Sequence, residues 1–224
     1  MLYFVIFILL TFASLLVQNT LKSRFSKYSK IPIGSGMTGA QVAQKMLYDN
    51  GIYDVSVISA NGYLTDHYDP SKKTISLSSD VYGKCSIAAA AVAAHETGHA
   101  IQHATSYAPL KLRSALVPVV NFASMTVQWV LLAGVLLINI FPSLLWAGII
   151  LFALTTLFSI VTLPVEVNAS SRAIAWLTNA GIVDYESRPM AIDALKWAAY
   201  TYFIAAISSL ATLLYYIGIA RNNN

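Results

Sequence analysis

Four long apolar stretches limit what this chain can fold into more than any other feature of its sequence. A window of about 19 residues places them at residues 1–18, 116–140, 143–163 and 197–220. Each approaches or exceeds the ~20 apolar residues that a helix needs to cross a hydrocarbon core of about 30 Å. Apolar residues make up 57% of the chain and charged residues only 11%, against a usual ~25% charged. The sequence therefore predicts a mainly α membrane protein with about four transmembrane helices.

The basic residues indicate how these helices are oriented. Of the 14 lysine and arginine residues, ten lie between the first and second spans, three lie between the third and fourth, and only Arg221 falls elsewhere. Loops rich in lysine and arginine stay in the cytosol. We therefore expect both large loops in the cytosol and both termini outside, in a bacterial cytoplasmic membrane. The first stretch has no basic region before it, and its cations follow it, so an uncleaved anchor is favoured over a signal peptide.

One segment outside the spans is long enough to form a small domain. Residues 40–48 show helical spacing of apolar side chains. Residues 55–58 and 63–64 flank an Asn-Gly pair, which predicts a hairpin. A further turn is predicted at Asp69-Pro70, and residues 74–78 alternate like a half-buried strand. These pieces predict a helix with a small antiparallel sheet, that is, an α+β domain. The strand at 74–79 is expected to have a free edge where an extended peptide substrate can add; the alternative is an interior strand.

The predicted division of the chain follows from these spans and loops. It consists of a transmembrane anchor at 1–18, a cytosolic α+β domain at 19–113, two transmembrane helices at 114–163, a cytosolic helical loop at 164–196, and a transmembrane helix with a short tail at 197–224.

The residues that carry chemistry are His95-Glu96-Thr97-Gly98-His99, an HExxH motif in an alanine-rich stretch at 86–105 that predicts a helix. Residues i and i+4 share one helix face, so both imidazoles can reach one zinc ion at roughly 2.0–2.1 Å. Glu96 is rotated by about 100° from His95, which places its carboxylate beside the metal. There it can take a proton from a zinc-activated water and pass it to the leaving amine. We predict one Zn²⁺ per chain, with Glu96 as the catalytic base; the plainer alternative is a helix whose histidines merely pack.

A catalytic zinc site usually has three protein ligands, so a third must come from elsewhere. The positions that a metzincin fills with glycine and histidine hold neither here. His103 lies about 12 Å along the helix axis from His95, which is poor geometry for one metal. Glu166 is favoured, because two spans separate it from the motif and return it to the same membrane face. We expect it near the start of a helix with Pro164 in the first turn, where a solvated acid is the alternative; Glu186 is expected to be a surface charge.

These motifs resemble those of a known family. HETGHAIQH after an alanine-rich run, with LTDHYDP before it and LPVEVNASSRA after it, resembles the YugP-type neutral zinc metallopeptidases, small bacterial membrane zincins related in pattern to the HtpX and CAAX-protease zincins. The resemblance covers nearly the whole chain. It implies His95, His99 and Glu166 as zinc ligands and Glu96 as base. The related zincins carry Glu-x-x-x-Asp at the third ligand, where the aspartate supports a ligand histidine; this chain has Ser170 in that position.

Peptide hydrolysis also needs a donor for the developing oxyanion, and metal ligands need partners that orient them. The candidates for these two roles are His67, His103, Tyr107, Ser170, Arg172 and Tyr202. Plainer interpretations exist for three of them: His67 as a turn residue, His103 as a packing histidine and Arg172 as a salt-bridge partner.

The function that the sequence predicts is a membrane-embedded zinc metalloendopeptidase, with its site at the cytosolic membrane surface. Its expected partners are peptide or membrane-protein substrates and the lipid bilayer, but not nucleic acid, because the cations mostly flank apolar stretches. An intramembrane protease is the first alternative, although no predicted span contains an acidic residue. A non-catalytic zinc-binding scaffold is the second, and a transporter without intramembrane charges is the weakest.

Overall fold

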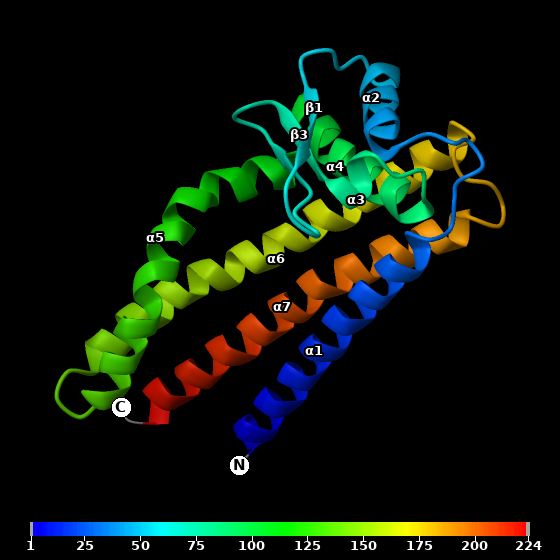
Figure 1. Ribbon diagram of the computed structural model, residues 1–224. Coiled ribbons are helices and arrows are strands. Elements are labelled where there is room, and N and C mark those ends of the chain that lie inside the picture. Colours follow the sequence, from blue (N-terminus) through cyan, green and yellow to red (C-terminus); the bar gives the residue numbers. More distant parts are fainter. Residues whose placement is uncertain (1, 223–224) are drawn as a thin grey trace.

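Four long helices dominate the computed structural model, which describes residues 2–222 (Figure 1). They are α1 (Leu2–Tyr28), α5 (Ala108–Leu136), α6 (Pro142–Asn179) and α7 (Arg188–Asn222). Each is long and apolar enough to cross a membrane, which confirms the prediction of a mainly α protein with four candidate spans. Helices α1, α6 and α7 extend beyond the predicted apolar stretches, whereas α5 starts before its stretch and ends at Leu136, before the predicted end at 140. The points where the chain enters and leaves the lipid therefore stay predictions.

The long helices lie side by side in a row. Within the described residues, α5 packs along α6, α6 along α7, and α7 along α1 (Figure 1). Asp193 at the start of α7 joins α1 to α7, because its carboxylate accepts a hydrogen bond of 2.6 Å from the Tyr28 hydroxyl and lies 3.4 Å from Arg24 Nε. Thr156 and Ser209 join α6 to α7 through a hydroxyl pair 2.8 Å apart.

Helix α5 consists of two parts that pack very differently. From Val120 onward it buries side chains, and at Gly134 it comes so close to α6 that an added Cβ would meet Leu145 Cα at 2.6 Å. None of its first twelve residues, 108–119, is buried. Pro118 lies at the boundary between these two parts of α5. A proline inside a helix removes a hydrogen bond and kinks the chain. Figure 1 shows residues 108–119, here named the arch, standing away from α6.

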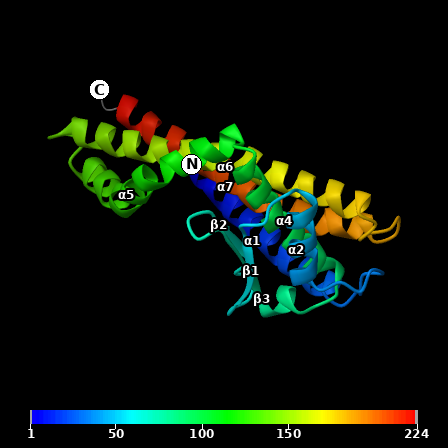
Figure 2. The same cartoon turned by 90° about the horizontal axis from the view of Figure 1, so that it is seen from above.

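The small domain surrounds the short helix α4. Its elements are α2 (Gly39–Asp49), β1 (Ser56–Ala60), β2 (His67–Asp69), β3 (Thr74–Ser78), α3 (Ser79–Tyr82) and α4 (Ile87–Ala104). The side chain of Ser86 caps α4 by accepting a hydrogen bond from Ala89 N. In Figure 2, α4 lies between the sheet and α6, and it packs on both α2 and α6. The predicted helix at 86–105 is thus confirmed.

The sheet differs from the predicted antiparallel hairpin. Its order is β1-β3-β2, with β1 parallel and β2 antiparallel to β3. The turn forms at Asp69, whose Oδ1 accepts hydrogen bonds from Ser71 N and Lys72 N, rather than at the Asn-Gly pair. The predicted return strand at 63–64 is therefore wrong, and β3 is the interior strand. The expected peptide-binding edge at 74–79 is wrong for the same reason; on the cavity side, the free edge belongs to β2.

The predicted helix start at Pro164 is also wrong. Helix α6 runs without interruption for 38 residues, and Pro164 lies inside it. Glu166 is therefore not a solvated acid in a first turn: it is a mid-helix residue, and only 4% of its side chain is exposed. Long apolar helices tolerate an internal proline where neighbouring helices support the chain.

Candidate metal centre

Close packing of α4 against α6 brings the HExxH motif to Glu166. The contact is made by Gly98, where an added Cβ would lie 2.7 Å from the carbonyl oxygen of Ala169 and 3.2 Å from its Cα. Those atoms belong to the backbone and cannot turn aside, so only glycine permits this approach. Glu166 precedes Ala169 by three residues, about one helical turn. The glycine inside the motif therefore sets the distance between the two helices.

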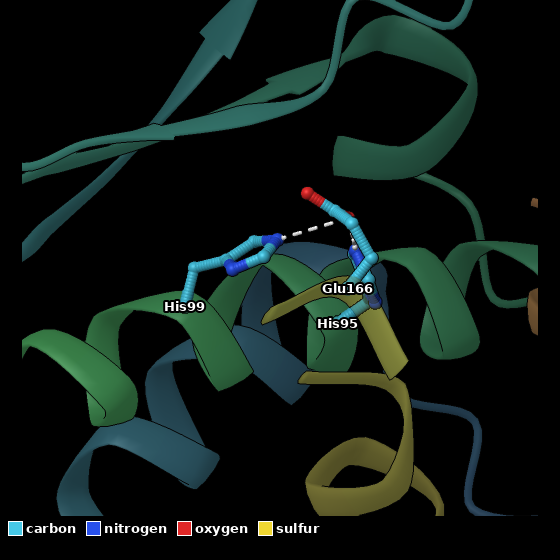
Figure 3. A group of neighbouring side chains, drawn as sticks. All are labelled: His95, His99 and Glu166. Atoms are coloured by element: carbon cyan, nitrogen blue, oxygen red, sulfur yellow. Dashed lines mark ion pairs between the residues drawn. The ribbon is translucent and has the colours of Figure 1, made fainter. Parts of the chain in front are cut away.

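Two histidines of α4 and one glutamate of α6 form a tight cluster (Figure 3). Glu166 Oε2 lies 3.3 Å from His95 Nε2 and 3.5 Å from His99 Nε2. Each residue offers one ligand atom, and these atoms all lie within 4.8 Å of one another. Only 12% of each histidine side chain is exposed. The cluster is the group in the described residues that could hold a metal ion.

Gln102 fixes the protonation of His99. Its side-chain amide nitrogen donates to Val165 O at 2.8 Å and to Asn168 Oδ1 at 3.0 Å. Its amide oxygen therefore faces His99 Nδ1, 3.0 Å away, and accepts the proton that Nδ1 carries. This leaves the lone pair of His99 Nε2 directed at the cluster. Because Gln102 is fully buried, this network also ties α4 to α6.

Ser170 occupies the equivalent position beside His95. Its hydroxyl lies 3.1 Å from His95 Nδ1, so it can accept the proton there and leave Nε2 free. Arg172, in contrast, donates from Nε to Asn168 Oδ1 at 2.8 Å. Asn168 is thereby shared between Arg172 and Gln102, which connects the arginine indirectly to the histidine network.

The electrostatics of the cluster favour a positive charge at its centre. Glu166 Oε2 is buried and has no hydrogen-bond partner. When both histidines are neutral and carry their protons on Nδ1, three lone pairs converge at the centre of the cluster. Burial lowers the pKa of His99, but the carboxylates of Glu166 and Glu96 more than offset it, so that pKa is raised. Converging lone pairs of this kind repel one another unless a cation lies among them.

A cavity of about 680 Å³ opens beside the cluster. Its lining includes Glu96, which is buried next to the two histidines as the HExxH spacing predicted. The lining residues come from β2 and the loop around it, α4, the arch, α6 and α7; besides the cluster they include Asp66, Tyr68, Arg113 and Val117, and Tyr202, which interacts with Glu166. Burial raises the pKa of Asp66, although Ser78 donates two hydrogen bonds to its carboxylate. The site is thus a chamber between the small domain and the long helices.

Four of the residues that were predicted as oxyanion donors or as partners of the metal ligands line the cavity: His67, His103, Tyr107 and Tyr202. His67 begins β2, not the predicted turn, and its Nδ1 lies 2.8 Å from Thr65 O. His103 Nδ1 lies 3.0 Å from the Tyr68 hydroxyl.

Several residues of the site were missed by sequence reasoning. Gln102 could have been found, because it follows His99 by three positions and so shares its helix face. Gly98 and Tyr68 depend on contacts with distant segments, which no local pattern reveals. Arg113 lines the cavity with a buried Nε that has no hydrogen-bond partner.

Comparison with known proteins finds a family and a relative that match nearly the whole chain. A family model described as "Putative neutral zinc metallopeptidase" matches residues 3–221. A relative from Bacillus subtilis (strain 168), described as "Putative membrane protease YugP", is 45% identical over 221 residues, which cover 97% of each chain. No solved structure matches the chain.

Proposed function

The chain belongs to this family of neutral zinc metallopeptidases, as the sequence motifs predicted, and from that premise we propose that it is a membrane-embedded zinc endopeptidase. The observation that carries the proposal is the convergence of His95, His99 and Glu166 ligand atoms beside a buried Glu96. Two histidines and a glutamate from a second helix form the ligand set that some catalytic zinc sites use.

The residues present fit zinc in their chemistry. Imidazole nitrogens and a carboxylate oxygen are typical zinc donors, and the buried Glu166 Oε2 has no hydrogen-bond partner. Gln102 and Ser170 hold the two Nδ1 atoms, so both Nε2 atoms are available. When bound, zinc supplies a Lewis acid that polarises the substrate carbonyl and makes water a nucleophile near neutral pH.

Glu96 is proposed as the general base and acid. Its carboxylate is buried at the cavity wall beside both histidines, where it takes a proton from the attacking water and gives it to the leaving amine. A donor at the cavity wall can stabilise the oxyanion, and Tyr202 and Arg113, which line the cavity, are proposed for this role.

Substitution of Glu96 by glutamine tests this function. Glu96→Gln keeps the shape of the side chain but removes the base, so casein hydrolysis should fall by at least ~100-fold, while zinc content stays at the wild-type level. Zinc content is measured by mass spectrometry of the purified proteins, in parallel with hydrolysis. An absence of zinc in both proteins, or full activity in the variant, would refute the proposal.

The orientation is part of the proposal. The placement of 13 of 14 cations in two loops supports a cytosolic site in a cytoplasmic membrane. A reporter fused after Asn224 should register outside the cytosol, because four spans return the C-terminus to the side of the N-terminus. A cytosolic signal from that fusion would overturn the four-span topology.

A further inference from the structure

The cavity at the metal cluster extends to the arch. Besides the metal cluster, it is lined by Leu110, Lys111, Arg113, Ser114 and Val117 of the arch. No arch residue is buried, and Figure 1 shows that part of α5 standing away from α6. The cavity is therefore bounded on this side by a helix segment that contains no buried residue.

The far end of the cavity lies at the level of the hydrocarbon. Val117 belongs to the apolar stretch at 116–140 and lines the cavity. Glu166, in contrast, lies just beyond the apolar stretch at 143–163. One continuous space thus joins the metal cluster to Val117, which is expected to lie within the lipid.

The lining changes in polarity along this path. Val117 is apolar, whereas Arg113 and Ser114, which precede it on the arch, and Tyr202, which interacts with Glu166, offer side-chain donors. The guanidinium of Arg113 lies over the Phe158 ring, 5.8 Å from its centroid, and its Nε has no hydrogen-bond partner. A peptide that unwinds at the edge of the lipid must replace its lost backbone hydrogen bonds. Unused donors at this depth can provide them.

From these observations we propose that the arch is a lateral entrance, through which a membrane-inserted segment of a substrate protein passes from the lipid into the cavity. The apolar segment lies against Val117, and the peptide that follows it reaches the metal cluster. This inference rests on the proposed peptidase function. It predicts a substrate class: proteins whose scissile bond lies next to an apolar, membrane-inserted segment.

Two neighbouring valines allow a matched test of the docking step. Val117 and Val119 are both on the arch and 38% and 47% exposed, but only Val117 lines the cavity. Cys85 is the single cysteine, so Cys85→Ser gives a background in which Val117→Cys or Val119→Cys adds one thiol. Glu96→Gln is included so that the substrate is held uncut. The probe is a single-span protein with a casein-derived tail and one cysteine in its span, reconstituted in phosphatidylethanolamine and phosphatidylglycerol vesicles.

Oxidative cross-linking to Val117→Cys should exceed that to Val119→Cys by several-fold. Equal yields, or no cross-link at either position, would overturn the lateral entrance, as would a phospholipid that fills the cavity and excludes the probe. Cross-linking does not require hydrolysis. If the probe cross-links at Val117→Cys but the active protein with zinc bound cleaves no peptide, the proposed function fails while the docking surface stands.

A kinetic comparison tests the same proposal in the active protein. Confinement to the membrane alone raises the rate for an anchored substrate, so the informative quantity is the ratio of kcat/KM for the anchored probe to that for its free tail. Val117→Trp should lower this ratio by at least ~10-fold, because the bulky ring fills the entrance. Val119→Trp should leave the ratio unchanged. An equal ratio in both variants would contradict the proposal.

Discussion

The helix α4 and the arch border the same cavity but are held in opposite ways. In α4, 13 of its 18 residues are buried, and Gly98 places its backbone against that of α6. In the arch no residue is buried. Metal ligands need positions fixed to within a fraction of an ångström, which close packing provides. A loosely packed helix can admit another polypeptide, since little contact must be broken.

The two regions should differ most in how far the stability of the protein falls when a side chain in each is enlarged. Gly98→Ala places a Cβ 2.7 Å from Ala169 O, so α4 and α6 must separate at a cost of about 1–3 kcal/mol. This loss should outweigh the ~1 kcal/mol that alanine normally gains over glycine in a helix. Thermal unfolding in detergent and zinc content should both decrease.

Two controls sharpen this comparison. Gly83→Ala adds the same methyl group where no atom lies within 4 Å, and Ala115→Leu adds bulk to an exposed position of the arch. Both should change the unfolding free energy by no more than ~0.5 kcal/mol. If Ala115→Leu destabilised the protein as much as Gly98→Ala, the contrast between the regions would be false.

A smaller effect is expected from the network that orients His99. Gln102→Ala removes the acceptor of His99 Nδ1 and the donor to Val165 O and Asn168. Loss of such a partner typically lowers metal affinity by about 10–100-fold, which a competitive chelator titration measures. Gln44→Ala, on the exposed face of α2, should leave the affinity unchanged. Unchanged affinity in Gln102→Ala would mean that His99 needs no such support.

The parts of the fold that the sequence predicted correctly are those with local signals. Long apolar stretches predict helices of sufficient length, and the HExxH spacing predicts one helix face. The sheet was mispredicted because an Asn-Gly pair favours a turn but cannot choose a partner strand, whereas Asp69 forms its own local turn. Pro164 was misread because its cost inside a helix depends on neighbouring helices.

The candidate site was likewise predicted where the signal is local and missed where it depends on contacts between distant segments. Its cluster residues were predicted from spacing and from the parity of the spans, and the family resemblance pointed to the same set. The roles of Gly98 and Gln102 follow from the register of α4 on α6, which only the folded chain defines. The arch could not be predicted either, since its lack of burial depends on how α5 packs against the other helices.

The most direct test of the account is the zinc content of two glutamine variants. Glu166→Gln removes the carboxylate that faces both Nε2 atoms, whereas Glu186→Gln changes an exposed glutamate of the loop before α7. Purified proteins are dialysed against a weak chelator and measured by mass spectrometry, with His103→Ala as a further control. We expect about one zinc ion per chain in wild type, Glu186→Gln and His103→Ala. Glu166→Gln should bind zinc at least ~10-fold more weakly and should therefore lose most of its zinc during dialysis. Full zinc in Glu166→Gln, or an equal loss in His103→Ala, would contradict the proposed metal centre.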